Sequence, residues 1–364
     1  MQASTNQKII MTTIFKHKQL FLKVALAITL TGLLTNCSNP SKKTNGSTTG
    51  PAEKELTKVE TAAESTTPMP TDTAKYNKTI LALANGDTTL RWPVKKQPYP
   101  QAGAILPYNR IVAYYGNLFS KKMGILGQLP PKEMLAKMDL EIKKWEKADP
   151  KTPVQPALHY IAVVASGTKG KDGKFRTRMP DKQIDSVLTI ARMRKHMIVF
   201  LDIQVGLSTI EQELPRLEKY LKLPNVHLGI DPEFSMKNGK RPSTSIGTFD
   251  ASDVNYCSNY LAKLVRDNHL TPKVFIVHRF TQRMITSYRN IKLHPEVQIV
   301  MNMDGWGEPS LKKGSYYFFI YKEPVQFTGF KLFYINDLKK APNHMMTPDE
   351  IMKLKPVPVY IQYQ

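Results

Sequence analysis

Two carboxylates, Asp231 and Glu233, directly follow the apolar run 227–230 and are separated by one proline. In an extended strand, residues i and i+2 point to the same face and lie about 6–7 Å apart. Pro232 has no amide hydrogen to donate to a neighbouring strand, so it belongs where the pairing of a sheet ends. The pattern predicts two acids at the carboxyl end of a buried strand, suited to proton donation and charge stabilisation. The alternative is an Asp-Pro loop whose acids cap the next segment.

Other apolar runs of strand length also end in polar or aromatic side chains. These are Tyr115, Asn117, Ser166, Asp202, Gln204, His278, Asn302, Asp304, Trp306, Lys331, Tyr334 and Gln362. If parallel strands close into a barrel, their carboxyl ends converge on one mouth. Aromatic faces there would stack on sugar rings, and paired carboxylates would protonate a glycosidic oxygen and stabilise an oxocarbenium ion. The residue types at this mouth therefore predict a carbohydrate site.

Several of these residues have a structural alternative. Asp202 lies in an otherwise apolar run and could pair with Lys331 or Arg279 inside the barrel. A buried histidine with satisfied hydrogen bonds explains His278 slightly better than a general base does. Trp306 either packs or forms a sugar platform, and its position beside an acid favours the platform. The four acids could also hold a hard cation such as Ca²⁺ or Mg²⁺, but we assign no metal ligand and expect no cofactor.

Apolar and amphipathic segments alternate from Arg110 to the end of the chain. The expected strands cover 110–117, 156–166, 196–204, 227–234, 273–280, 297–306, 327–335 and 357–363. The expected helices cover 130–148, 181–195, 209–221 and 251–268, with shorter ones carrying Met284 and Tyr288, near Ser310 and after Thr347. Strands without polar alternation that are separated by helices imply a parallel sheet covered on both faces. Eight such units predict a (β/α)₈ TIM-type barrel that ends on its eighth strand. No glycine fingerprint follows the first strand, which argues against a dinucleotide fold.

Residues 1–37 have the features of a lipoprotein signal peptide. Basic residues in the range 16–23 precede an apolar run, 24–34, that is too short to span a bilayer comfortably. The run leads into Asn36 and Cys37, which resemble a lipobox whose cysteine carries the lipid anchor, although Asn36 departs from the usual small residue. The alternative is an uncleaved membrane anchor. Both place the folded part outside the cytoplasm, and we expect a protein of the cell envelope that is anchored to the outer membrane.

Three further segments follow the predicted signal peptide. Residues 38–75 are rich in Ser, Thr, Lys, Glu and Pro and predict a flexible linker. Residues 76–109 contain several prolines and are expected to pack on the barrel, which occupies 110–364. If Cys37 carries lipid, Cys257 is a single thiol without a partner, and we expect it to be buried.

The 364-residue chain is strongly basic, since Lys and Arg exceed Asp and Glu by 52 − 30 = 22. This excess favours contact with anionic surfaces, although a lysine-rich solvated surface explains it better. No helix-turn-helix, zinc-finger or aromatic RNA-binding signature accompanies the charge, so we expect no nucleic-acid partner.

Three groups of residues form recognisable motifs. They are Tyr114-Tyr115-Gly116-Asn117 with Met123-Gly124-Ile125-Leu126-Gly127, Ile230-Asp231-Pro232-Glu233-Phe234, and Met303-Asp304-Gly305-Trp306-Gly307. Together they resemble an uncharacterised family of bacterial lipoproteins with a glycoside-hydrolase-like barrel, from about Ile111 onward. The Asp-x-Glu pair is also distantly similar to chitinase-like enzymes, which implies Glu233 as the acid and Asp231 as the residue that positions a substrate acetamide. The run 228–230 departs from those enzymes, in which further aspartates precede the pair.

The first functional hypothesis is a membrane-anchored, glycoside-hydrolase-like protein that acts on an envelope or imported polysaccharide. Glu233 would be the general acid, Asp231 would stabilise the developing charge or orient an N-acetyl group, and Asp304 or Asp202 would be the second carboxylate. The remaining mouth residues would bind the substrate. The second hypothesis is a non-catalytic lipoprotein that binds a glycan or another envelope component at the same mouth. A third is a metal-dependent phosphodiesterase, which requires cation binding.

Overall fold

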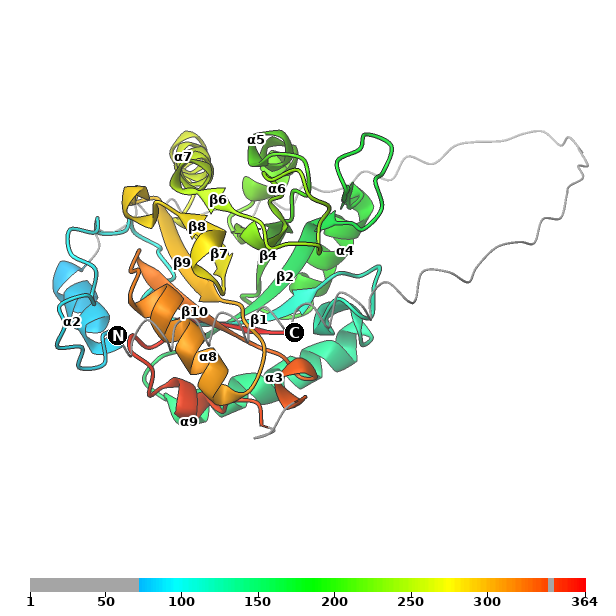
Figure 1. Cartoon of the computed structure of the whole chain (residues 1–364). Helices are drawn as coiled ribbons and strands as arrows, with labels where there is room; N and C mark the ends of the chain where they lie inside the picture. Colours follow the sequence, from blue (N-terminus) through cyan, green and yellow to red (C-terminus); the bar gives the residue numbers. More distant parts are fainter. Residues whose placement is uncertain (1–71, 340–343) are drawn as a thin grey trace, which may run out of the picture.

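A closed barrel of eight parallel strands forms the centre of the protein (Figure 1). The computed structural model describes residues 72–339 and 344–364. The barrel strands are β1 (Arg110–Gly116), β2 (Val154–Ala165), β4 (Ile198–Ile203), β5 (Val226–Ile230), β7 (Lys273–Arg279), β9 (Val297–Met303), β10 (Phe327–Leu332) and β11 (Tyr360–Tyr363). Because β1 pairs with both β2 and β11, the sheet closes on itself. The predicted fold class is confirmed, and β11 is the last element, as expected.

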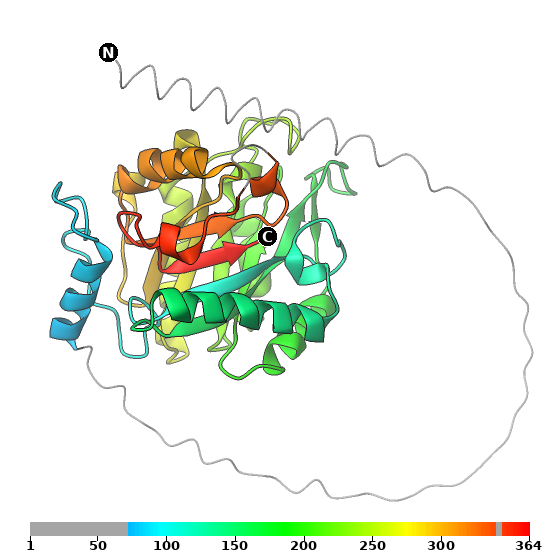
Figure 2. The same ribbon diagram turned by 90° about the horizontal axis from the view of Figure 1, so that it is seen from below.

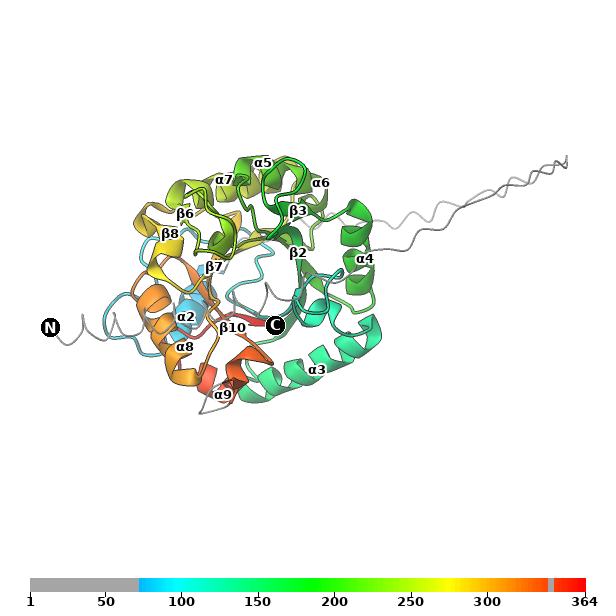
Figure 3. The ribbon, with the colours of Figure 1, turned by 45° about the vertical axis from the view of Figure 1, so that its right-hand side comes forward.

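Helices surround this barrel on the outside (Figure 3). They are α3 (Pro131–Ala148), α4 (Asp181–Arg192), α5 (Ile210–Glu213), α6 (Glu218–Leu221), α7 (Ala251–Asp267), α8 (Pro309–Tyr316) and α9 (Pro348–Ile351). A π-helix, η7 (Tyr317–Tyr321), continues α8. Short 3₁₀ helices complete the connections: η2 (Ile125–Gly127), η3 (Leu214–Leu217), η4 (Pro232–Phe234), η5 (Gln282–Met284), η6 (Tyr288–Asn290) and η8 (Asn336–Leu338). Three short strands lie outside the barrel: β3 (Arg176–Arg178), β6 (Phe249–Asp250) and β8 (Ile285–Thr286).

Side chains alternate between the inside and the outside of the barrel along each strand. On β4, Ile198 and Phe200 belong to the interior apolar cluster, whereas Val199 and Leu201 pack against the helices. The next residue of the inward series is Asp202. The same change occurs on β7, where Ile276 is followed two residues later by His278. The interior is therefore apolar near the strand starts and polar near their carboxyl ends.

The segment before the barrel closes its amino-terminal end. It contains helix α2 (Thr73–Leu83), which lies at one end of the barrel in Figure 2 (blue). Leu106 is fully buried in the interior cluster, and its backbone exchanges two hydrogen bonds with the amide of Gln298, at 3.0 and 2.6 Å. The backbone amide of Val357 donates to the carbonyl of Leu83 at 2.8 Å. These contacts fix the extension to the strand starts, away from the predicted mouth.

Two connections differ from the expected helices. The predicted helix 209–221 is divided into α5, η3 and α6, because Pro215 has no amide hydrogen to continue the α-helical ladder. The predicted helix carrying Met284 and Tyr288 is wrong: this stretch consists of η5, β8 and η6. Ser287 adopts a left-handed conformation there, with φ 55°, and Ile285 pairs with Phe249 of β6.

Some expected features lie outside the described residues, including the signal peptide, Cys37 and nearly all of the linker. Helix α2 begins at Thr73, inside the last three residues of the expected linker. Within the described residues, none of the helices combines the length and apolarity that a membrane crossing requires. Cys257 is fully buried on α7, as expected.

Candidate active site

Three carboxylates meet at the carboxyl-terminal mouth of the barrel. Asp231 and Glu233 follow β5, and Asp304 follows β9. One oxygen from each lies within 4.8 Å of the others. Asp231 and Asp304 are only 3% and 6% exposed, whereas Glu233 is half-buried. The mouth therefore gathers acids that are more than 70 positions apart in the chain, as the strand ends predicted.

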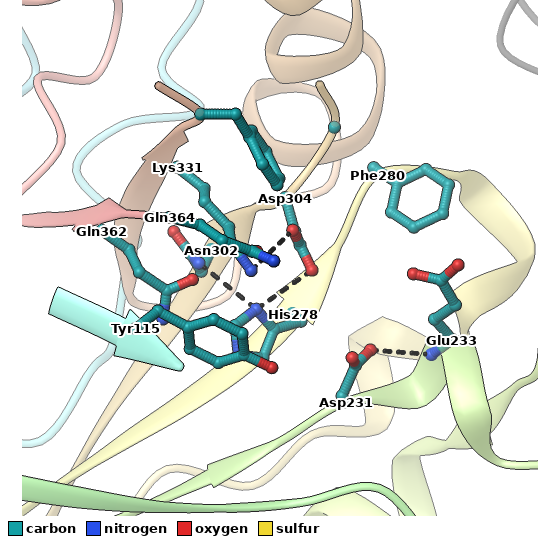
Figure 4. A network of polar contacts seen from close by, with 12 residues as sticks. Tyr115, Asp231, Glu233, His278, Phe280, Asn302, Asp304, Lys331, Gln362 and Gln364 are labelled. Atoms are coloured by element: carbon teal, nitrogen blue, oxygen red, sulfur yellow. Dashed lines mark hydrogen bonds and ion pairs between the residues drawn. The ribbon is translucent and has the colours of Figure 1, made fainter. Parts of the chain in front are cut away.

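The local geometry of Asp231 and Glu233 is a turn and not a strand. β5 ends at Ile230, and Asp231 caps the 3₁₀ helix η4 by accepting a hydrogen bond from the backbone amide of Glu233 at 3.0 Å. The expectation that strand alternation sets the two side chains side by side is wrong, because Pro232 starts the turn at once. The capping alternative describes the backbone correctly. Both carboxylates nevertheless reach the mouth (Figure 4).

Asp304 is held by two basic groups. Its Oδ1 atom lies 3.2 Å from Nζ of Lys331, and its Oδ2 atom lies 3.2 Å from Nδ1 of His278 (Figure 4). The Lys331 side chain is 3% exposed, and its ammonium lies 3.8 Å from the ring centroid of Tyr115. Opposite charges at these distances favour the ionised form of a carboxylate. Asp304 is thus a fixed negative charge at the mouth.

Asp202 lies deeper than the other three acids and is completely buried. Its Oδ1 atom lies 3.4 Å from Nε2 of His159 and 3.6 Å from Nε2 of His278, and its Oδ2 atom accepts a hydrogen bond from Tyr115 at 3.1 Å. The expectation that Asp202 faces the substrate as a second carboxylate therefore does not fit, because protein groups surround it. It pairs with histidines, and not with the Lys331 or Arg279 of the structural alternative.

Burial and neighbouring charges separate the pKa values of these groups. Burial, with repulsion from Asp304, Glu233 and Asp202, raises the pKa of Asp231 to about 7 against the attraction of His278. Burial alone would also raise the pKa of Asp202, but His278 and His159 hold it well below its usual range. Near neutral pH, Asp231 is therefore a candidate proton carrier and Asp202 is ionised.

The two interior histidines have opposite shifts. Burial lowers the pKa of His278, but Asp202 and Asp304 raise it by more, to about 10. Burial lowers the pKa of His159 to about 4, because Asp202 only partly compensates. The first is therefore an imidazolium at neutral pH, and the second is neutral. His278 therefore matches neither sequence-based alternative, a buried neutral histidine with satisfied hydrogen bonds or a general base.

Other predicted residues line the space around this cluster. Gln204 donates to Oδ2 of Asp231 at 3.2 Å and to the Tyr115 hydroxyl at 3.4 Å. The amide nitrogen of Asn302 lies 3.4 Å from Nδ1 of His278, and that of Gln362 donates to the Tyr360 hydroxyl at 2.8 Å. Trp306 is half-buried and directly follows the Asp304 segment. The amides of Gln204 and Asn302 thus contact the charged cluster directly.

Two predicted substrate-binding residues do not join the site. The Tyr334 ring stacks on Tyr363 outside the barrel wall, and its hydroxyl donates to Glu141 of α3 at 3.2 Å. It points outward because β10 ends at Leu332 and the chain turns there. Asn117 is fixed by backbone: its amide donates to the carbonyl of Ile161, and its oxygen accepts from the Phe119 amide. In this structure, both residues contact protein groups away from the carboxylate cluster.

No family model, curated protein or solved structure matches this chain. The resemblance to a lipoprotein family therefore stays a prediction. The structure shows a TIM-like barrel.

Two further residues, His159 and Gly229, shape the surroundings of Asp202. His159 is not among the predicted mouth residues, but β2 begins at Val154 and is long, so His159 reaches Asp202. Gly229 carries no functional group, but a Cβ atom at this position would lie 2.5 Å from both Asp202 Oδ1 and His159 Nε2. The inward series through Ala157 was the available signal for His159, since residues two apart share a face.

Among the residues that the structure describes, two groups of side chains have a geometry that could hold a metal ion. Asp231, Glu233 and Asp304 offer carboxylate oxygens, which suit Ca²⁺, Mg²⁺ or Mn²⁺. His159, Asp202 and His278 offer two imidazole nitrogens and a carboxylate oxygen, a set that suits a transition metal. The second group is fully buried and already contains a charge pair between Asp202 and His278.

Proposed function

We propose that this protein is a glycosidase-like hydrolase that is tethered to the cell envelope and cleaves an envelope or imported polysaccharide. The observation that carries the proposal is the close group of Asp231, Glu233 and Asp304 at the barrel mouth, with oxygens within 4.8 Å. Glycosidases cleave with two carboxyl groups, one as a proton donor and one as a base, nucleophile or charge stabiliser. The mouth of a TIM barrel is where enzymes of this fold carry their active sites.

The roles follow from exposure and charge. Glu233 is the most exposed of the three acids and lies on the short turn η4, so it reaches a leaving-group oxygen most readily. Asp304, paired with Lys331 and His278, is the ionised carboxylate that stabilises the oxocarbenium ion or attacks it. Asp231, whose pKa burial raises to about 7, donates a hydrogen bond to a substrate group such as an N-acetyl oxygen.

The separation of the two catalytic carboxyl groups sets the stereochemical outcome of glycoside hydrolysis. Retaining enzymes have carboxyl groups about 5–5.5 Å apart, whereas inverting enzymes leave about 6.5–9.5 Å for a water molecule. The nearest oxygens of Asp231, Glu233 and Asp304 lie within 4.8 Å of one another, a contact between single oxygens that either class can make. Nuclear magnetic resonance of the first-formed anomer would test this point once a substrate is found.

A glycan library assayed for both binding and released reducing ends tests the proposal. Glu233→Gln should lower the hydrolysis rate at least about 100-fold while glycan binding persists, because loss of general acid catalysis removes about 10²–10⁴-fold. Glu146→Gln on the exposed face of α3 is the matched control and should hydrolyse normally. Binding without reducing ends would favour the glycan-binding alternative, and unchanged hydrolysis by Glu233→Gln would reject the assignment.

The same carboxylates give one specific reason to test a metal-dependent phosphodiesterase. Calorimetry with Ca²⁺, Mg²⁺ and Mn²⁺ should show no heat if the acids act as a glycosidase pair. Binding that is lost in Asp304→Asn would favour the phosphodiesterase. The lipid anchor is tested separately, since Cys37→Ser should release the protein from the membrane fraction.

A further inference from the structure

Three buried polar atoms lie close together in the barrel interior beneath the mouth. Nε2 of His159 lies 3.4 Å from Oδ1 of Asp202, and Nε2 of His278 lies 3.6 Å from the same oxygen. All three side chains are completely buried. In the part of the chain that the structure describes, none of these three atoms has a hydrogen-bond partner. Buried polar atoms of native proteins are nearly always satisfied, so three unsatisfied atoms at one point indicate a missing partner.

The second ring nitrogen of each histidine has a polar neighbour. Nδ1 of His278 lies 3.2 Å from Oδ2 of Asp304 (Figure 4). Nδ1 of His159 lies 2.6 Å from the hydroxyl of Tyr360, which can accept its proton. Histidines that bind metals donate their other ring N–H to a carboxylate or another acceptor, which fixes the ring and leaves the first nitrogen free to bind. Both histidines have this arrangement.

Asp202 and Gly229 complete the geometry. Oδ2 of Asp202 accepts a hydrogen bond from the Tyr115 hydroxyl at 3.1 Å, so Oδ1 is the oxygen that faces the histidines. A Cβ atom on Gly229 would lie 2.5 Å from both this oxygen and Nε2 of His159. The glycine on β5 therefore leaves room at the point where the polar atoms of β2 and β4 converge.

We propose that His159, Asp202 and His278 bind one divalent transition metal ion, such as Zn²⁺. Ligand atoms around a tetrahedral ion with bonds of about 2.0–2.1 Å lie about 3.3–3.4 Å apart. The printed separations of 3.4 and 3.6 Å are close to this value, and one atom from each residue lies within 4.8 Å of the others. Two imidazoles and one carboxylate suit zinc or iron, whereas Ca²⁺ and Mg²⁺ prefer oxygen ligands alone.

The number of ligands indicates the kind of metal site. Among the described residues, no fourth histidine, cysteine or acid belongs to this group. Structural zinc sites have four protein ligands, whereas catalytic ones have three and leave a position for water or a substrate atom. We therefore expect an open position on this metal ion. The site also contacts the carboxylates of the mouth, because His278 lies beside Asp304.

This inference goes beyond the proposed function and does not depend on it. The mouth group of Asp231, Glu233 and Asp304 offers only oxygens, so the two groups select different cations. A metal ion binds neutral imidazole, so its uptake displaces the proton that His278 otherwise carries. The imidazolium form of His278 therefore belongs to the metal-free protein.

Calorimetry with Zn²⁺ on the full chain, first stripped with a chelator, tests the proposal. At pH 7.5 the wild type should bind one Zn²⁺ ion per chain. His159→Gln, Asp202→Asn and His278→Gln should each weaken this binding at least about 100-fold, because even the loss of an outer partner of a metal ligand costs about 10–100-fold.

Two control variants separate this site from other histidines and from the mouth. His227→Gln changes a buried histidine of β5 that is not part of the group and whose Nδ1 accepts from the backbone amide of Val274. Glu233→Gln removes one acid of the mouth group. Both variants should bind Zn²⁺ with the affinity of the wild type.

Three results would overturn the assignment. They are a wild type that binds no Zn²⁺, undiminished binding in any of the three ligand variants, or binding that is lost in Glu233→Gln, which would place the ion at the mouth. X-ray absorption of the Zn²⁺-loaded wild type decides even if the ligand variants do not fold. Two imidazoles in the first coordination shell would support the site, and a shell without imidazole would reject it.

Discussion

Gly229 lies directly against Asp202, and a Cβ atom on this glycine would be 2.5 Å from the Oδ1 atom of that acid. The two residues are register partners on the neighbouring strands β5 and β4. The same Cβ would lie 2.5 Å from Nε2 of His159. Only a residue without a side chain lets the His159–Asp202 pair form. The run 228–230, which departs from the chitinase-like pattern, thus has its own structural reason here.

Gly229→Ala should destabilise the protein by about 1–3 kcal/mol, because an added methyl group in a packed interior forces its neighbours to move. Thermal or urea unfolding measures the effect. Gly167→Ala is the matched control, since a Cβ there has no atom within 4 Å. An unchanged free energy of unfolding for Gly229→Ala would contradict the tight packing of this layer.

Asp231 should make the protein less stable as the pH rises from about 4 to about 7. Its pKa is raised from 3.8 to about 7, mainly by burial, so the folded state keeps a proton that the unfolded chain releases. The stability of the wild-type protein should therefore fall relative to Asp231→Asn across this window, by on the order of 3 kcal/mol. Urea unfolding of both proteins at pH 4.5 and pH 8 provides the comparison, and parallel stability curves would show that Asp231 ionises normally.

His278 should contribute stability that is lost at alkaline pH. Its folded pKa is raised from 6.5 to about 10 by Asp202 and Asp304, which outweigh the lowering effect of burial. The contribution is fully present below about pH 6.5 and disappears as the pH rises through 10. His278→Gln should therefore be about 3–5 kcal/mol less stable than the wild type near pH 6.5, since it leaves two buried acids without their shared partner. The difference in unfolding free energy between the wild type and His278→Gln should become smaller by pH 10. A difference that stays constant with pH would contradict an ionised His278.

Glu213 should contribute strongly to the stability of the protein, because it joins the two arginines of β3 to the loop after β4. It is fully buried, and it accepts hydrogen bonds from Nε of Arg176 at 2.8 Å, Nε of Arg178 at 2.7 Å and Oγ of Ser208 at 2.5 Å. Glu213→Gln should cost about 3–5 kcal/mol of stability, because it removes the buried negative charge that both arginines share and leaves only the more exposed Asp172 beside Arg176.

The exposed pair between Lys219 and Asp181 provides the control for Glu213. Its atoms are only 2.6 Å apart, but both side chains are more than half exposed, at 58% and 64%. Asp181→Asn should therefore cost less than about 1 kcal/mol. Equal losses of melting temperature in the two variants would show that burial does not govern these ion pairs.

The local sequence pattern predicts the barrel strands well. It predicts the segments that connect them less well. Every barrel strand overlaps a predicted one, because uninterrupted apolar runs such as 198–201 can be buried only in a sheet covered on both faces. The stretch after β7 was wrong, since Met284 and Tyr288 suggested a helix face while Ile285 pairs with β6. A two-residue contact with a distant strand leaves no periodic signal.

The sequence alone determined the barrel and the chemical character of its mouth, because burial and the two-residue period of a strand act within a few residues. It did not determine which groups meet. Closure of β1 onto both β2 and β11 fixes the register of neighbouring strands, and register sets the depth of each inward side chain. That is why Asp304 joins Asp231 and Glu233 at the mouth, while Asp202 lies one layer below between two histidines. The tertiary structure decided this separation of acids, since depth in a closed barrel depends on all of its strands together.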